Sequence, residues 1–216
     1  TEAAHKVGAK VGFDLAHAVG NVPLHLHDHK VDFAVWCSYK YLNSGPGGIS
    51  GVFVHENHAH NLTIPRFAGW WGHNEEQRFL MKKGFIPMEG ADGWQHSNVN
   101  VLTAAAHLAS LEIVSETGID ALRKKSLLLT GYLEYLLLEM NLDERSIEII
   151  TPTNAEERGC QLSLLVNNKG KEIFDKLTKN GIVADWREPN VIRVAPVPLY
   201  NTFEDVYRFV KLLEIA

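Results

Sequence analysis

The sequence has little cysteine, no long apolar run and no excess of basic charge. Two of its 216 residues are cysteines, Cys37 and Cys160. So few thiols fit a reducing cytosol better than a disulfide-linked framework. The formal net charge is −5, and lysine and arginine are not clustered. This charge distribution argues against nucleic-acid binding as the main role.

The sequence also lacks the patterns of a membrane or secreted protein. No apolar run approaches the roughly 20 residues that a membrane-spanning helix needs, and no secretory signal pattern opens the sequence. We therefore expect a cytoplasmic α/β protein with no membrane partner.

Two polar residues, Asp14 and Lys40, each follow a short apolar run. Residues 11–13 lead into Asp14, and residues 31–37 lead into Ser38-Tyr39-Lys40. Such runs predict buried parallel strands whose carboxyl ends open onto a site. A lysine and an acid at one edge suit pyridoxal phosphate, because the lysine amine links to the cofactor and the carboxylate keeps its pyridine nitrogen protonated. Taken singly, each residue would more often be a surface charge or a turn residue.

A glycine-rich turn follows the lysine. The turn spans Gly45-Pro46-Gly47-Gly48, and residues 49–55 form an apolar run that predicts a returning strand. Glycines at such a turn allow positive φ and a close approach of the backbone to a cofactor. We expect the turn and the strand to hold the lysine loop rigidly.

Helical periodicity dominates the middle of the chain. One apolar pattern predicts a helix from Val101 to the Thr117-Gly118 break, and a second predicts a long amphipathic helix over 119–140. Helices of that length often connect two lobes, so we expect domains at 1–118 and 119–216. The fold class that follows is α/β: part of a large domain with a mainly parallel sheet, then a small α+β domain.

The small domain has its own pattern of short elements. Thr202 is a plausible N-cap for its last helix, and Gly181 a plausible left-handed stop for its first. The expected strands are 147–151, 161–166, 182–185 and 191–195, and the expected helices are 171–180 and 203–215.

Two histidine groups suggest metal binding but favour another interpretation. His25, His27 and His29 alternate, which could place three imidazoles on one side of an extended segment. Few carboxylate or thiolate partners accompany them, so we favour solvated loops both here and for His55, His58 and His60. No metal site is predicted.

Two further features leave alternatives open. Arg193 stands in an apolar run, where a guanidinium needs an anion: either a substrate carboxylate or a pair with Asp185 or Glu188. The adjacent Trp70 and Trp71 form either a pocket wall or a hydrophobic cluster under a loop.

The first residues look like the tail of a helix that runs directly into an interior strand. Nothing before residue 1 supplies the neighbouring strands or crossover helices of the expected sheet. We therefore expect the sequence to be the carboxyl-terminal portion of a longer protein whose amino-terminal half is missing.

Taken together, the Asp-Leu-Ala-His and Ser-Tyr-Lys patterns resemble fold-type-I pyridoxal phosphate enzymes of the aminotransferase class V group. Four longer runs resemble the kynureninase family more specifically: residues 14–21, 36–43, 69–73 and 192–201. This resemblance implies a pyridoxal phosphate-dependent homodimer with shared active sites. It implies hydrolysis of L-kynurenine or 3-hydroxykynurenine to anthranilate or 3-hydroxyanthranilate plus L-alanine, in tryptophan catabolism and NAD biosynthesis.

The resemblance also assigns roles to individual residues. Lys40 would carry the cofactor, Asp14 would pair with its pyridine nitrogen, and Tyr39 would contact the phosphate and act as an acid or base if its pKa is lowered. The remaining expected contacts are His17 near the cofactor ring, Trp70 with the phosphate of the partner subunit's site, Asn98 with cofactor and substrate, and Ser97, His73 and Arg193 with the substrate.

Other functions share this scaffold. A class V aminotransferase or a cysteine desulfurase would use the same acid and lysine, but a desulfurase needs an exposed cysteine on a mobile loop. Cys160 instead opens an expected strand. An inactive fragment that lacks half of its active site is the third possibility.

Overall fold

The structure, a computed structural model, describes residues 1–141 and 146–215. Residues 142–145 and 216 fall in the second expected domain but lie outside the described residues. The chain forms two compact units, Thr1–Glu116 and Thr117–Ala216. Each unit is described by itself.

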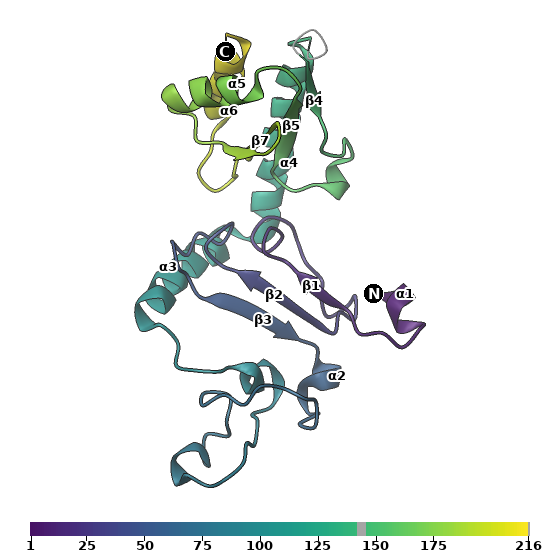
Figure 1. Ribbon diagram of the computed structural model, residues 1–216, viewed down its shortest axis with the longest axis vertical. Helices are drawn as coiled ribbons and strands as arrows, with labels where there is room; N and C mark the ends of the chain where they lie inside the picture. The colour runs from purple at the N-terminus through teal and green to yellow at the C-terminus, as the bar shows by residue number, and fades with distance from the viewer. Residues whose placement is uncertain (142–145, 216) are drawn as a thin grey trace. The chain divides into compact units, whose positions relative to one another are not determined.

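Unit 1 is built on a three-stranded sheet with the order β1-β2-β3 (Figure 1). β1 (Gly12–Asp14) runs parallel to β2 (Phe33–Cys37), and β3 (Ser50–Val54) returns antiparallel to β2. The expected parallel pair and the returning strand are thus both present. The other elements are α1 (Glu2–His5), α2 (Glu56–Ala59), α3 (Val101–Thr117) and the 3-10 turns η1 (Arg78–Leu80) and η2 (Gly90–Trp94).

One face of this sheet is open, which differs from the expectation of buried strands. Phe33 and Val35 are each 46% exposed, whereas Ala34, on the opposite face, is fully buried. With Val52 and Trp94, the open face lines a cavity of about 600 Å³. The apolar runs predicted the strands correctly, but burial on both faces requires covering elements that the described residues do not provide.

The helix α3 was predicted correctly, but its apolar side chains are exposed. Leu102 is 83% exposed and Leu108 is 60% exposed. The apolar periodicity therefore predicted the helix, but it did not predict whether other elements bury its apolar side chains.

The irregular segment 61–100 is held by its backbone and by one buried arginine. The Arg78 guanidinium donates hydrogen bonds to the backbone carbonyls of Trp71 and His73, at 3.1 and 2.9 Å. A Cβ atom placed at Gly69 would lie 2.2 Å from the Gln95 carbonyl oxygen. The two ends of the segment therefore approach so closely that only glycine fits at this position.

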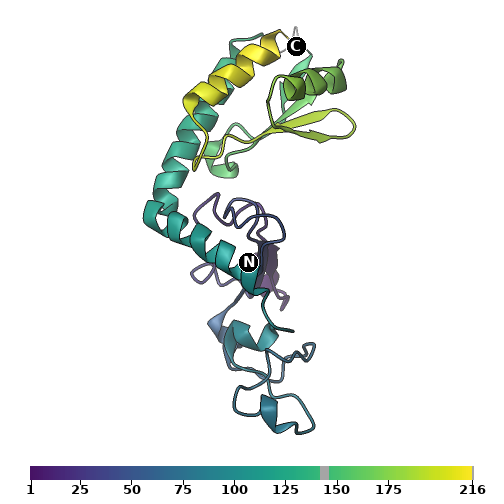
Figure 2. The same cartoon turned by 90° about the vertical axis from the view of Figure 1, so that its left-hand side faces the viewer.

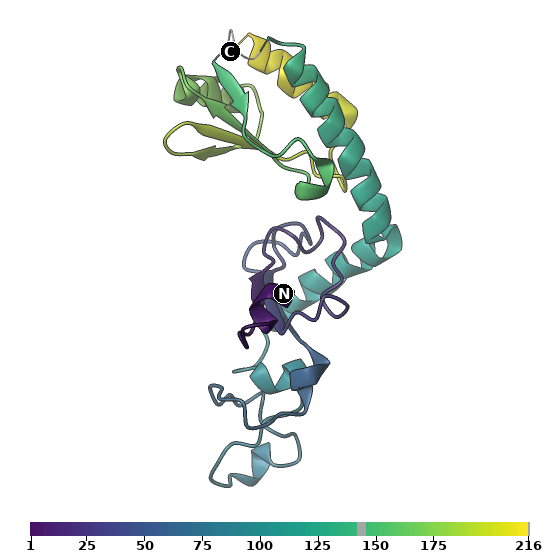
Figure 3. The same ribbon diagram turned by 90° about the vertical axis from the view of Figure 1, so that its right-hand side faces the viewer.

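Unit 2 is an antiparallel sheet whose one face is covered by helices. The strand order is β4-β5-β7-β6, and Figures 2 and 3 show α4 and α6 side by side. The strands are β4 (Ile147–Ile149), β5 (Leu162–Val166), β6 (Asp185–Arg187) and β7 (Val191–Val194). The helices are α4 (Ile119–Leu138), α5 (Gly170–Lys179), α6 (Phe203–Glu214) and the 3-10 turn η3 (Ala155–Glu157).

The core of unit 2 follows from the alternation of its strands and the periodicity of its helices. Leu162, Leu164 and Ile192 on the sheet are fully buried and belong to one cluster with Leu129 and Leu133 of α4. Burial of one such side chain contributes roughly 1.5–3 kcal/mol. The broad apolar face that the sequence predicts for α4 therefore packs on the sheet.

In the small domain, one expected strand differs from the structure and one expected helix stop agrees with it. The strand expected over 182–185 begins at Asp185, because Ile182 packs partly against the core while Val183 is fully exposed. Gly181 has φ +82° directly after α5, as expected for a left-handed stop. Within the described residues, the helices are either too short or too polar to cross a membrane.

Candidate active site

Asp14 and Lys40 lie at the same edge of the β1–β2 pair. Asp14 is the last residue of β1, and Lys40 lies in the turn just after β2. Parallel strands present their carboxyl ends at one edge, so both side chains are delivered there. The sequence predicted this arrangement from the two apolar runs.

Lys40 has a defined partner at this edge. Its Nζ lies 3.0 Å from Nε2 of His17. When Lys40 is an ammonium it can only donate, and Nε2 of His17 is then the acceptor. The contact joins the lysine loop to the turn after β1.

The turn after β1 also orients the Asp14 carboxylate. One carboxylate oxygen accepts a hydrogen bond of 2.9 Å from the Ala16 backbone N–H. The residue itself is exposed, so the carboxylate is accessible to a ligand. A carboxylate held this way is available as an acceptor for a protonated nitrogen.

Tyr39 is half-exposed beside Lys40 and interacts with Cys37. Its ring centroid lies 6.0 Å from Lys40 Nζ. A hydrogen bond with Cys37 is the main cause of a pKa of Tyr39 raised above its ordinary value. The lowered pKa, on which the sequence analysis made an acid or base role of Tyr39 conditional, is therefore not found.

Cys37 lies near this site, which the sequence analysis did not expect. It is only half-buried, and its Sγ lies 3.9 Å from the Ala16 carbonyl oxygen. Its position three residues before Lys40, at the end of β2, was the signal that it could reach the site.

The four candidates in segment 61–100 form separate local contacts. The Trp70 ring, 42% exposed, packs edge-on against Phe79 at 5.4 Å. His73 accepts a hydrogen bond from the Ile86 N–H at its Nδ1, at 3.0 Å. Ser97 and Asn98 are exposed. Among the described residues, no hydrogen bond or ring contact joins these four to Lys40 or Asp14.

Arg193 of unit 2 forms the ion pair that the sequence offered as an alternative to substrate binding. Arg193 on β7 lies opposite Asp185 on β6, and its Nε and Nη2 lie 2.6 and 2.5 Å from one oxygen of Asp185. Arg187 donates to the same oxygen at 2.9 Å. Two guanidinium groups therefore share one partly exposed carboxylate.

The two histidine groups differ from each other in the structure. His25, His27 and His29 are exposed as expected, but they lie in a helical turn and not in an extended segment. Within residues 1–141 and 146–215, histidine, cysteine and acidic side chains do not gather into a group of three that could hold a metal ion.

His55 is buried and His58 is partly buried, so the expectation of a solvated loop was wrong for them. His55, 4% exposed, caps α2 by accepting a hydrogen bond from the Asn57 N–H. His58 donates to the carboxylate of Asp32 at 2.5 Å.

Asp32, at the other end of β2 from Lys40, is a buried charge that the sequence did not single out. The carboxylate is 6% exposed and also binds His5 at 2.7 Å and Lys10 at 3.4 Å. Burial alone would raise its pKa, but hydrogen bonds from His5, the Val11 N–H, His58 and Lys10 together hold the pKa well below its usual range. The signal in the sequence was a charge between two apolar residues.

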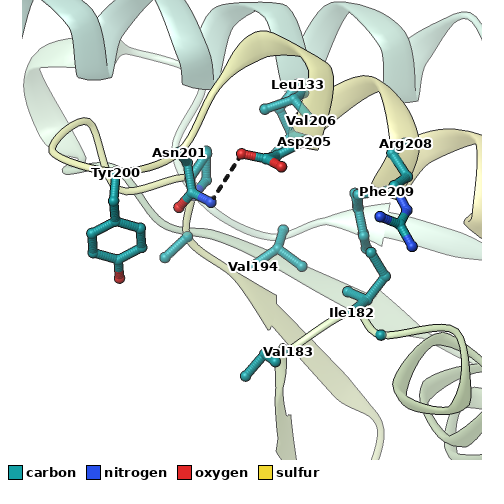
Figure 4. Close-up of a pocket in the computed structure, with 13 residues that line it drawn as sticks. Leu133, Ile182, Val183, Val194, Tyr200, Asn201, Asp205, Val206, Arg208 and Phe209 are labelled. Atoms are coloured by element: carbon teal, nitrogen blue, oxygen red, sulfur yellow. Dashed lines mark hydrogen bonds between the residues drawn. The ribbon is translucent and has the colours of Figure 1, made fainter.

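Unit 2 contains a cavity of about 380 Å³ next to α6. Figure 4 shows Asn201 and Asp205 facing each other at its rim, with an Nδ2–Oδ2 distance of 3.5 Å. Arg208 binds the Asn180 carbonyl oxygen at 3.4 Å. This cavity contains none of the residues that the sequence assigned to a site.

Comparison with solved structures defines the class of fold. The cysteine desulfurase CsdA of Escherichia coli has a TM-score of 0.77 at 18% identity, covering 99% of this chain and 53% of its own. A variant of C-DES with glycine covalently linked to its pyridoxal phosphate cofactor has a TM-score of 0.74 at 17% identity, covering 92% of this chain and 49% of its own. The chain therefore has the fold of the pyridoxal phosphate-dependent transferases.

Sequence comparison is more specific. Kynureninase of Flavobacterium psychrophilum is 59% identical over 215 residues, which are 99% of this chain and 51% of that protein. Kynureninase of Myxococcus xanthus is 54% identical over 214 residues, 99% of this chain and 50% of that protein. Residues 122–213 match the family model of the kynureninase C-terminal domain. The chain spans about half the length of the curated relatives it matches.

Proposed function

We propose that the protein containing this chain is a pyridoxal phosphate-dependent kynureninase. It would hydrolyse the side chain of L-kynurenine or 3-hydroxykynurenine to anthranilate or 3-hydroxyanthranilate plus L-alanine. The observation that carries the proposal is that Lys40 and Asp14 lie at the carboxyl ends of two neighbouring parallel strands, at one edge of the sheet. High identity to proteins named kynureninase supports the choice of reaction.

The chemical groups at this edge fit pyridoxal phosphate. Lys40 offers a primary amine and Asp14 an exposed carboxylate that can hold a proton at the pyridine nitrogen. We propose His17, Tyr39, Trp70 and Asn98 as the remaining cofactor contacts on this chain. When bound, the cofactor supplies an electron sink for the electron pair left on the substrate α carbon.

Lys40 is the proposed carrier of the α proton. As a free amine it can accept a proton, and as an ammonium it donates to Nε2 of His17, which keeps Nζ at the edge of the sheet. His17 thus orients the group that moves the proton.

Tyr39 is the proposed proton donor for cleavage of the side chain. A phenol is protonated at neutral pH at its ordinary pKa of about 10, and the hydrogen bond with Cys37 raises the pKa of Tyr39 further. A protonated phenol can give a proton to a leaving group or to a carbonyl oxygen but cannot remove one. This argues for an acid role where the sequence left acid and base open.

Arg193 is the proposed clamp for the substrate carboxylate, with Ser97, Asn98 and His73 as further substrate contacts. Asp185 now occupies the guanidinium, so a substrate carboxylate would have to replace it. That exchange is feasible because Asp185 is 46% exposed and keeps Arg187 as a second partner. Arg193 would then bind the incoming carboxylate through two parallel hydrogen bonds.

We further propose the organisation of the whole protein. Residues 1–118 would be part of the large cofactor-binding domain, and residues 119–216 the linking helix and small domain. The protein would be a cytoplasmic homodimer in which Trp70 contributes to the partner subunit's site. Exposure of Trp70 supports the last point.

The test is to supply pyridoxal phosphate and compare L-kynurenine with L-cysteine as substrates. We expect release of anthranilate and alanine from kynurenine, with Asp14→Ala slowing it by several orders of magnitude. A loss of less than about tenfold, roughly 1.4 kcal/mol, would mean that Asp14 only caps a turn.

Release of sulfide from cysteine would favour a desulfurase, although complete burial of Cys160 argues against that reaction. Transfer of the amino group to a keto acid would favour an aminotransferase.

A further inference from the structure

Two buried serine hydroxyls lie beneath the loop that carries Lys40. Ser38 is fully buried and Ser44 is 3% exposed, although both flank an accessible loop. Their Oγ atoms are 2.8 Å apart. The Ser38 hydroxyl also binds the carbonyl oxygen of Ile49, just before β3.

The direction of each hydrogen bond in this group is determined. The Ile49 carbonyl oxygen can only accept, so the Ser38 hydroxyl must donate its single proton there. The Ser44 hydroxyl must therefore donate to Ser38. The result is an ordered chain, Ser44 to Ser38 to Ile49, in which both protons are used.

The surrounding backbone packs closely around the two hydroxyls. The Ser44 N–H donates to the Ser38 carbonyl oxygen at 3.2 Å, which closes the loop a second time. A Cβ atom at Gly48 would lie 2.0 Å from Ser44 Oγ, so the turn is packed directly on the hydroxyl. Asn43, at φ +56°, turns the chain back and donates its N–H to the Lys40 carbonyl oxygen at 3.1 Å.

We propose that the hydrogen-bond chain from Ser44 through Ser38 to Ile49 is a positioning device that keeps Lys40 Nζ at His17. Ser38 and Ser44 are positioning residues, since both act through the loop backbone. The inference rests on the proposed function only in that Lys40 is the reactive amine. The device itself is a property of the loop and can be measured without the cofactor.

The test measures the reactivity of the Lys40 amine in the variants Ser38→Ala and Ser44→Ala. Limiting acetic anhydride is applied across a range of pH, and mass spectrometry gives acetylation of Lys40 relative to the exposed Lys82. We expect each variant to change this ratio by about fivefold, the equilibrium factor for one hydrogen bond.

Matched variants separate positioning from stability. Ser126 is also fully buried, and its Oγ has no hydrogen-bond partner among the described residues, so Ser126→Ala should leave the ratio unchanged. Ser44→Cys keeps a donor at this position, a weaker one on a larger sulfur atom, and should fall between wild type and Ser44→Ala. If Ser44→Ala fails to fold, Ser44→Cys alone decides. A ratio unchanged in the serine variants, with or without a loss of stability, overturns the proposal.

A second readout distinguishes this inference from the proposed function. Each protein is treated with pyridoxal phosphate and borohydride, and labelled peptides are identified. Labelling of Lys40 in wild type, with a decrease in the serine variants, supports both ideas. If the acetylation ratio changes but wild-type Lys40 is not labelled, the positioning device stands and the cofactor role of Lys40 fails.

Discussion

Lys40 and Lys30 flank the same strand, but their amines have different surroundings. Lys30 is exposed, whereas Lys40 is partly buried and lies against His17. We predict that Lys40→Ala abolishes retention of pyridoxal phosphate after borohydride reduction, because no other lysine lies at that sheet edge among the described residues. Lys30→Ala is the matched control and should retain the cofactor. Cofactor trapped by the Lys40→Ala protein would refute the central assignment.

Asp32 is the residue on which the folding of unit 1 should depend most. Asp32→Asn keeps the shape but removes the charge that His5, His58 and Lys10 contact. We predict a loss of about 1.5–3 kcal/mol, the range for a hydrogen bond to a charged group. Urea unfolding measures it, and Asp28→Asn, a change at an exposed carboxylate, should have little effect.

The same residue predicts how stability depends on pH. Because the folded pKa of Asp32 lies below its unfolded value, its contribution is fully present above the unfolded pKa of about 4 and decreases as pH falls below it. The difference in unfolding free energy between wild type and Asp32→Asn should therefore be largest at neutral pH and shrink in acid. A difference that does not vary with pH would show that the charge is not what stabilises the site.

At the scale of elements, the pairing of β6 with β7 decides what Arg193 does. A partly exposed ion pair contributes about 0–1 kcal/mol, whereas loss of a buried substrate contact costs roughly 2–5 kcal/mol. We predict that Arg193→Lys raises the KM for L-kynurenine strongly and changes stability little, because an ammonium lacks the two-point geometry. Asp185→Asn should not raise the KM. Lower stability with an unchanged KM would leave Arg193 as the partner of Asp185 alone.

The final helix begins with a complete capping box. The Thr202 hydroxyl accepts from the Asp205 N–H, and the Asp205 carboxylate accepts from the Thr202 N–H. We predict that Thr202→Ala lowers the stability of unit 2 by about 1 kcal/mol, while Thr202→Ser is nearly neutral. Chemical denaturation measures both. Equal losses in the two variants would mean that the methyl group of the threonine, and not its hydroxyl, is responsible.

At the scale of the whole molecule, the two units differ in how much core each contains. A large cluster from α4, the second sheet and α6 fills unit 2, while unit 1 has few fully buried apolar side chains. We predict two unfolding transitions, of which Leu133→Ala lowers only the more stable one, by about 2–5 kcal/mol. Leu128→Ala, at a 58% exposed position on the same helix, should change stability by less than about 0.5 kcal/mol. A single transition that shifts as a whole would mean that the units unfold together.

The sequence by itself determined the elements whose cause is local. The sequence predicted β5 and, from its helical periodicity, α4, and Thr202 and Gly181 marked a helix start and a helix stop. It also predicted that Asp14 and Lys40 lie at one edge, because the carboxyl ends of parallel strands point to the same side of a sheet.

Only the tertiary structure decided which partner each polar side chain has. Three features show this: burial of Asp32 with His58, pairing of Arg193 with Asp185, and the raised pKa of Tyr39. Each depends on a residue that is distant in sequence, or on a neighbour whose orientation the sequence pattern does not specify. The exposed side chains of α3 have the same cause. Periodicity records which face of an element is apolar, but hydrogen bonds and burial depend on what lies opposite that face, which three-dimensional packing alone specifies.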